Sequence, residues 1–181
     1  MTSSTEHRSP VLTYLTYLVW AWAVAGFTAI LILAMLRMVP YAIEALSSSL
    51  SIVHLSVLIG NVLAMAYYEG YKGFQLSFSP RFAARAQTLV HKQSWSRVVF
   101  APLFCMGFFD APRRRIASAI ILTLAIISLV LIFRALPQPW RGILDAGVFV
   151  GLAWGCVVTV YFSVDALIRG GGRVPAEIDG Q

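Results

Sequence analysis

The chain has 181 residues, about the length of one domain, and it carries a net charge of +6. Hydrophobic residues make up 59% of it and charged residues 12%, against roughly 45–50% and 25% in an average soluble domain. A soluble domain of this size could not cover its surface with so few charges. The composition therefore excludes an ordinary soluble globular protein.

Four segments lack Asp, Glu, Lys and Arg and are each 18 to 26 residues long: 11–36, 45–68, 116–133 and 146–164. A helix of roughly 18–20 apolar residues crosses about 30 Å of hydrocarbon. We therefore expect an all-α integral membrane protein, a four-helix transmembrane bundle. Its membrane domain covers 10–169, with helices at about 11–38, 45–68, 113–135 and 143–167. A polar N-terminus (1–9), a loop (69–112) and a disordered tail (170–181) complete the chain.

The basic residues are distributed unevenly over the two sides of such a bundle. Eleven of the fourteen Lys and Arg residues precede the first helix, lie in the segment 69–115 or follow the last helix. The other three are Arg37, Arg134 and Arg141. Because positive residues stay in the cytoplasm, we expect both termini and the long loop to be cytoplasmic. We also expect the membrane to be a bacterial cytoplasmic membrane.

The 69–112 loop has its own pattern. Its glycines are expected to end the second helix, and Ser79 and Pro80 are typical of the start of another. That helix would place Phe82, Ala86, Leu89 and Val90 on one side and lie in the membrane surface. The apolar segment 98–109 is too short to span, so it is interfacial or re-entrant.

Small residues recur every four positions on the last helix, at Gly147, Gly151, Gly155 and Thr159. Such a strip lets another helix approach closely. Ser56, Gly60 and Ala64 form a weaker strip on the second helix. The partner of the stronger strip is either the second helix of the same chain, which we favour, or the last helix of another copy.

Polar residues recur every seven positions around the second helix, at Ser47, His54, Asn61 and Tyr68. This spacing places them on one slowly drifting stripe. The stripe predicts hydrogen bonds between helices. The alternative is a ligand pocket or proton path centred on His54 and Asn61.

The remaining charges are expected near the helix ends. Asp145 follows Arg141 by four residues, a spacing that pairs them. Glu69 and Asp165 are expected at the inner ends of the second and last helices, where the run of arginines at 113–115 would neutralise them. No acid is therefore expected at mid-membrane depth. This argues against an ion-driven transporter with a buried carboxylate. Contacts with anionic lipid headgroups are expected from the basic residues of the loop: Arg81, Arg85, Lys92, Arg97, Arg113, Arg114 and Arg115.

Cofactor chemistry has little support in the sequence. Cys105 and Cys156 are the only cysteines, which excludes a disulfide scaffold and thiolate metal clusters. We expect neither haem nor zinc, because His54 is the only histidine within a predicted span. Nucleic acid is not an expected partner, since the basic residues lie beside helix ends where anionic lipid lies.

These features favour a non-enzymatic accessory, assembly or scaffold subunit of a membrane complex, with a membrane-protein partner or self-association. The alternative is a binder or carrier of an amphiphile such as a lipid or quinone, held between the polar stripe and the basic loop. An enzyme acting on lipid would need a general base, for which His91 is the only candidate. We therefore assign no catalytic residue.

Overall fold

The computed structural model describes residues 10–91 and 94–178, and all the regular structure in those ranges is helical. The predicted polar segment 1–9 and residues 179–181 of the predicted tail lie outside the described residues. The elements in chain order are α1 (Pro10–Ser47), α2 (Ile52–Met65), the π-helix η1 (Ala66–Phe78), α3 (Ser79–His91), α4 (Trp95–Val99), α5 (Ala101–Met106), α6 (Arg113–Arg134) and α7 (Trp140–Arg169).

Four of the helical stretches are long and apolar enough to cross a membrane: Tyr14–Ser47, Ile52–Val90, Arg113–Arg134 and Trp140–Arg169. The second stretch joins α2, η1 and α3 into one continuous element, which we call the rod. The structure thus confirms the helical class and the number of apolar helices expected from the sequence.

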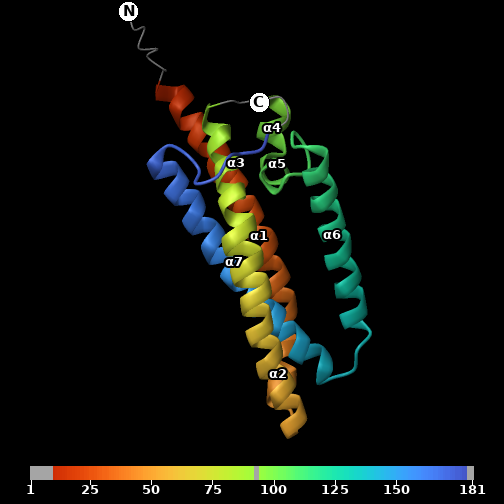
Figure 1. Ribbon diagram of the computed structural model, residues 1–181. Coiled ribbons are helices and arrows are strands. Elements are labelled where there is room, and N and C mark those ends of the chain that lie inside the picture. Colours follow the sequence, from red (N-terminus) through yellow and green to blue (C-terminus); the bar gives the residue numbers. More distant parts are fainter. Residues whose placement is uncertain (1–9, 92–93, 179–181) are drawn as a thin grey trace, which may run out of the picture.

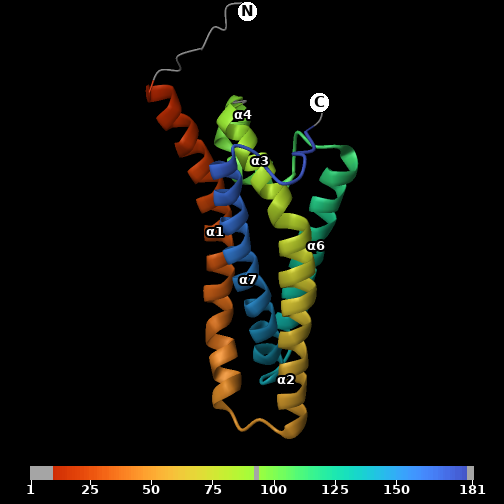
Figure 2. The same cartoon turned by 60° about the vertical axis from the view of Figure 1, so that its left-hand side comes forward.

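Three long elements pack together and the fourth stands apart. Figure 1 shows α1, α7 and the rod side by side, with α6 to one side of them, and Figure 2 shows the same bundle turned. No side chain of α6 is buried, and its main contacts are with α7. The described ends of the chain lie at the end of the bundle that also carries α4 and α5 (Figure 1).

The second helix does not end at its glycines, as the sequence had suggested. Gly70 is buried against Trp154 of α7, and a Cβ at this position would lie 2.9 Å from the Trp154 ring. The glycine is therefore present for close packing rather than as a terminator. Nor does Ser79 cap a new helix, because its backbone is itself helical and its N–H donates to the Phe74 carbonyl, five residues back. Pro80 has no N–H to donate, so the rod passes through this residue without one of its helical hydrogen bonds.

The first helix also runs further than predicted, passing through Pro40 to Ser47. Proline removes one helical hydrogen bond, but tertiary contacts hold the last turns in place. Ala45 is 2% exposed, and the Gln138 side chain donates to the Tyr41 carbonyl. The loop between the first two helices is shortened accordingly.

The apolar face of α3 faces protein, not a membrane surface. Phe82, Ala86 and Leu89 belong to a core with Phe27 of α1 and Phe104 of α5. The 98–109 segment forms α4, α5 and the turn after them, and it packs on α1 and α3. The predicted disorder of the tail is wrong for residues 170–178, since Ile178 is 8% exposed in the same core. We call α4, α5, 107–112 and 170–178 together the cap.

Two helical glycines provide a matched test of this packing. A Cβ on Gly142 would lie 2.1 Å from the Tyr41 carbonyl oxygen, whereas a Cβ on Gly60 would have no such neighbour within 4 Å. Gly142→Ala should lower the free energy of unfolding by about 2 kcal/mol. Gly60→Ala should leave it unchanged or raise it by up to about 1 kcal/mol. Thermal unfolding in detergent, followed by circular dichroism, measures both, and equal effects would contradict the α1–α7 contact.

Candidate functional site

The small residues of α7 form the floor of a seam that side chains of the rod enter. A Cβ on Gly147 would meet Asn61, one on Gly151 would meet Glu69, and one on Gly155 would meet the ring of Phe74. At the next position, Thr159 is buried and shares a hydrogen bond with Ser79, with 2.8 Å between their oxygens. The strip is therefore turned toward the rod of the same chain.

The weaker strip of small residues on α2 lies elsewhere. Ser56 and Gly60 are exposed and Ala64 is half-buried, and α2 itself has no buried residue. Within the described chain no helix packs closely on Ser56 or Gly60, so a role of this strip in helix packing stays a prediction. A four-residue spacing of small residues looks the same in the sequence whether the strip faces another helix or is exposed.

The polar stripe does not form a single pocket. Ser47 lies on α1 and bonds its own helix, and Tyr68 is 65% exposed. His54 forms a capping box with Ser51 at the start of α2 and contacts the Trp140 ring edge-on, with 4.8 Å between ring centres. Asn61 donates hydrogen bonds to another helix, from its Nδ2 to the Ile143 and Leu144 carbonyls of α7 at 2.9 and 3.3 Å.

Glu69 lies in the seam, close to the middle of both the rod and α7. Its side chain is half-buried against Gly151. Within 10–91 and 94–178, no hydrogen bond or ion pair reaches its carboxylate. The expected pairing with the arginines at 113–115 is wrong, because the helix continues past Glu69 and carries the acid far from them.

The other acids within 10–91 and 94–178 have partners. Arg141 and Asp145 pair at 3.8 Å, as their spacing predicted. Asp165 pairs with Arg169 at 2.7 Å and with Arg173 at 3.0 Å, not with the arginines at 113–115. Among these carboxylates Glu69 differs in being unpaired within the described chain.

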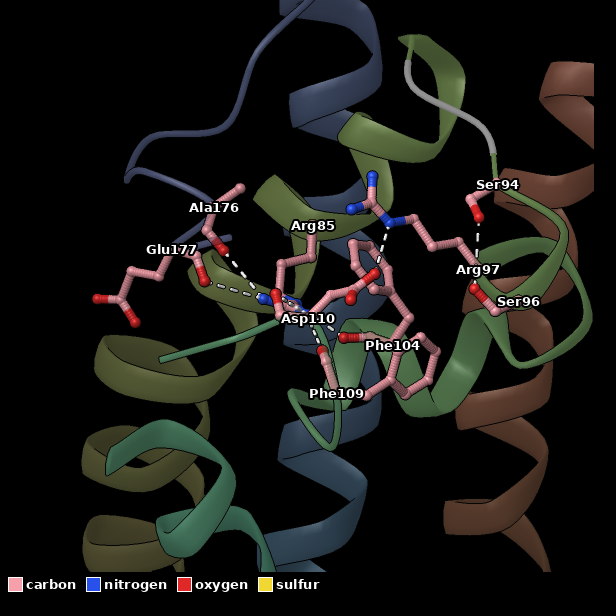
Figure 3. A network of polar contacts seen from close by, with 9 residues as sticks. All are labelled: Arg85, Ser94, Ser96, Arg97, Phe104, Phe109, Asp110, Ala176 and Glu177. Carbon is pink, nitrogen blue, oxygen red and sulfur yellow. Dashed lines mark hydrogen bonds and ion pairs between the residues drawn. The ribbon is translucent and has the colours of Figure 1, made fainter. Parts of the chain in front are cut away.

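Arg85 organises the cap (Figure 3). Its guanidinium is buried and lies 4.2 Å from the centre of the Phe104 ring. Its nitrogens donate to five backbone carbonyls, those of Phe104, Phe109, Asp110, Ala176 and Glu177. Five N–H groups are all that a guanidinium has. The predicted contact of Arg85 with anionic lipid is therefore wrong, since no donor is left for a phosphate.

Two further arginines of the predicted set are engaged within the chain. Arg97 pairs with Asp110 at 2.7 Å, and Arg115 pairs with Glu177 at 3.1 Å. Arg113 and Arg114 are exposed. Lys92 and the side chain of His91 lie outside the described residues.

A basic pocket of about 320 Å³ opens where the first turns of α6 face α3. It is lined by Arg81, Pro112, Arg114, Arg115, Ser118 and Glu177. Three arginines and one glutamate leave an excess positive charge there. Sequence reasoning named the arginines as lipid contacts but could not bring Arg81 beside the other two, because they belong to helices joined by more than twenty residues of irregular chain and short helices.

No group of three or more His, Cys, Asp or Glu side chains that could hold a metal ion occurs in the described part of the chain. Comparisons with protein-family models, curated proteins and solved structures found no match to this chain. The seam and the pocket are therefore the features of this chain that bear on its function.

The Arg85 network predicts how the cap fails. Lysine offers its donors from one nitrogen and cannot reach carbonyls on both sides of the cap. Arg85→Lys should therefore lower the free energy of unfolding by about 3 kcal/mol, whereas Arg113→Lys on the exposed first residue of α6 should change it little.

The reactivity of Cys105 provides a second measurement of how firmly Arg85 holds the cap in place. Cys105 is 3% exposed, and burial raises the pKa of its thiol, so it should resist maleimide in the folded protein. In a Cys156→Ser background, Arg85→Lys should make Cys105 react faster. Unchanged labelling and an unchanged unfolding midpoint would contradict the role given to Arg85.

Proposed function

We propose that this protein is a four-helix membrane protein that binds an amphiphile with an anionic headgroup, a lipid or a related molecule. The basic pocket between α3 and α6 is the observation that supports this. Basic pockets at the membrane-facing ends of helices bind phosphate-bearing headgroups. A guanidinium also matches the geometry of a phosphate or carboxylate better than an ammonium does.

The charges of the pocket suit this ligand. Arg114 has no hydrogen bond or ion pair within the described chain, so its donors are open to an anion. Arg115 shares its charge with Glu177, and Arg81 donates to Ser77 from one nitrogen. An anion in the pocket would therefore contact one guanidinium that has no partner in the described chain and two that each have one.

The surroundings of the pocket suit the rest of an amphiphile. Ser118, on the pocket wall, lies in the second turn of α6, and the helix beyond it is apolar up to Arg134. None of its side chains is buried by the protein. A hydrocarbon chain that extended from the pocket along α6 would cover this surface.

The same charge distribution supports an orientation. Most of the described arginines lie at the end of the bundle that carries the cap, so we place this end in the cytoplasm and the turns at 48–51 and 135–139 outside. A bacterial cytoplasmic membrane remains our proposal for the location. In that membrane the pocket would meet anionic headgroups of the inner leaflet.

A second candidate function is that of an accessory, assembly or scaffold subunit. It is supported by the isolation of α6, whose surface a transmembrane helix of a partner protein or of a second copy would cover equally well. Lipid tails are as apolar as leucine side chains, so exposed apolar residues alone do not decide between the two.

Native mass spectrometry after gentle detergent purification, with the released small molecules identified, tests the proposal. We expect a stoichiometric anionic amphiphile on the wild-type chain. Arg114→Gln should weaken the affinity for the amphiphile about fivefold, because one arginine contributes about 1 kcal/mol to the binding of an anionic headgroup, and its occupancy should fall accordingly. Arg113→Gln makes the same change of charge one residue away, outside the pocket lining, and should retain the ligand.

Two outcomes would overturn amphiphile binding. One is a chain that carries no small molecule but holds a defined protein partner, which would support the accessory subunit. The other is an equal loss of ligand from the Arg113 and Arg114 variants, which would show attraction by net charge without a site.

A further inference from the structure

We propose that the carboxyl group of Glu69 is a proton-binding site inside the helix bundle. The proposal is independent of the basic pocket, which lies at the cap end of the molecule. It rests on the position of Glu69 along the helices, on what surrounds it and on the backbone that carries it.

The first argument is depth. The arginines at its two ends mark α6 as a span of 22 residues, about 33 Å long. Helix α7 starts at Trp140, beside the Arg134 end of α6, and reaches Gly151 after eleven residues, about 17 Å. Since Glu69 packs on Gly151, its carboxyl group lies about halfway through the roughly 30 Å of a bilayer's hydrocarbon. Ionisable residues at this depth are costly and mark functional sites.

The second argument is the absence of a compensating charge among the described residues that surround Glu69. Helix α7 carries no Asp, Glu, Lys, Arg or His between Asp145 and Asp165, and its titratable groups in that interval are Cys156 and Tyr161. On the rod itself, the nearest cation is Lys72. Its ammonium lies over the rings of Tyr67 and Tyr68, at 5.6 and 5.8 Å from their centres.

The other two long helices contribute no partner either. Within the described chain, α1 has Arg37 and Glu44 as its charged residues, and both belong to its far end. Helix α6 has none between Arg115 and Arg134. An ionised carboxylate without a cation is unfavourable in apolar surroundings, whereas a protonated one is neutral. The bundle therefore favours a carboxyl group that holds a proton.

The third argument is the backbone. Glu69 lies in η1, thirteen residues in π-helical register. Wide π turns are rare and are frequently found at functional sites. Here the register turns Glu69, Gly70 and Phe74 toward α7, and Gly151 supplies the space that the carboxyl group occupies. Release of the proton would place a negative charge on this glycine-floored seam.

A carbodiimide experiment tests the proposal. A membrane-soluble carbodiimide such as dicyclohexylcarbodiimide reacts with protonated carboxyls, because the acid O–H adds across its C=N bond and the adduct rearranges to a stable N-acylurea. We expect wild-type protein in detergent or vesicles to be modified at Glu69, as located by peptide mass spectrometry. The modification should fall as pH is raised from about 5 to about 10. A water-soluble carbodiimide should modify Glu69 far less.

Two variants control the chemistry. Glu69→Gln keeps the shape of the protonated acid and should remove the modification, whereas Glu44→Gln at the far end of α1 should leave it intact. Modification of other carboxyls but not of Glu69 would overturn the proposal. Equal modification of Glu69 by both reagents would also overturn it, since it would place the carboxyl in water.

Stability gives a second measurement that does not depend on the reagent. If the folded bundle holds the proton more tightly than the unfolded chain, stability is greatest at low pH and declines as pH rises and the unfolded chain ionises. Glu69→Gln cannot ionise, so its unfolding midpoint should decline less between about pH 5 and about pH 9. Parallel pH profiles for wild type and Glu69→Gln would contradict proton binding at this site.

Discussion

The structure depends on the close approach of α7 to the rod. Water drives no association of apolar helices inside a membrane, so they are held by packing and hydrogen bonds. The glycines of α7 remove side chains from one strip of the helix, and Asn61, Glu69 and Phe74 occupy the space. At the last position of the strip, Thr159 forms a buried hydrogen bond with Ser79 of the rod. This seam places a carboxyl group between two helices.

The cap solves a different problem, that of satisfying irregular backbone beside an apolar core. Short helices and turns leave carbonyls without helical partners, and Arg85 collects five of them from the end of α5, the turn after it and the C-terminal segment. A residue that reads as a surface charge in the sequence is thus a structural crosslink (Figure 3). By fixing the turn before α6, it also sets where Arg114 and Arg115 stand relative to Arg81.

Helix α6 separates the two candidate functions. It follows the cap without packing along the bundle, and its apolar surface is left for lipid, a bound amphiphile or another helix. The basic pocket favours a ligand with an anionic head, because Arg114 has no partner within the described chain. Glu69 and the pocket lie at different positions along the rod, so the proton proposed at Glu69 and the ligand proposed at Arg114 would be separate properties of the molecule.

The sequence alone determined the helical class, the four apolar helices, the small-residue strip of α7 and the pairing of Arg141 with Asp145. These follow from composition, run length and i,i+4 spacing, which are local. Tertiary structure decided that the second helix continues past Gly70 and Gly73, that α3 is buried and that residues 170–178 are ordered. It also decided that Glu69 lies in mid-bundle and that Arg85 faces inward. In the sequence Gly70 looks like the end of a helix, and only the structure shows that Trp154 packs on it. Arg85 likewise looks like a surface residue, because the carbonyls that it contacts come from distant parts of the chain.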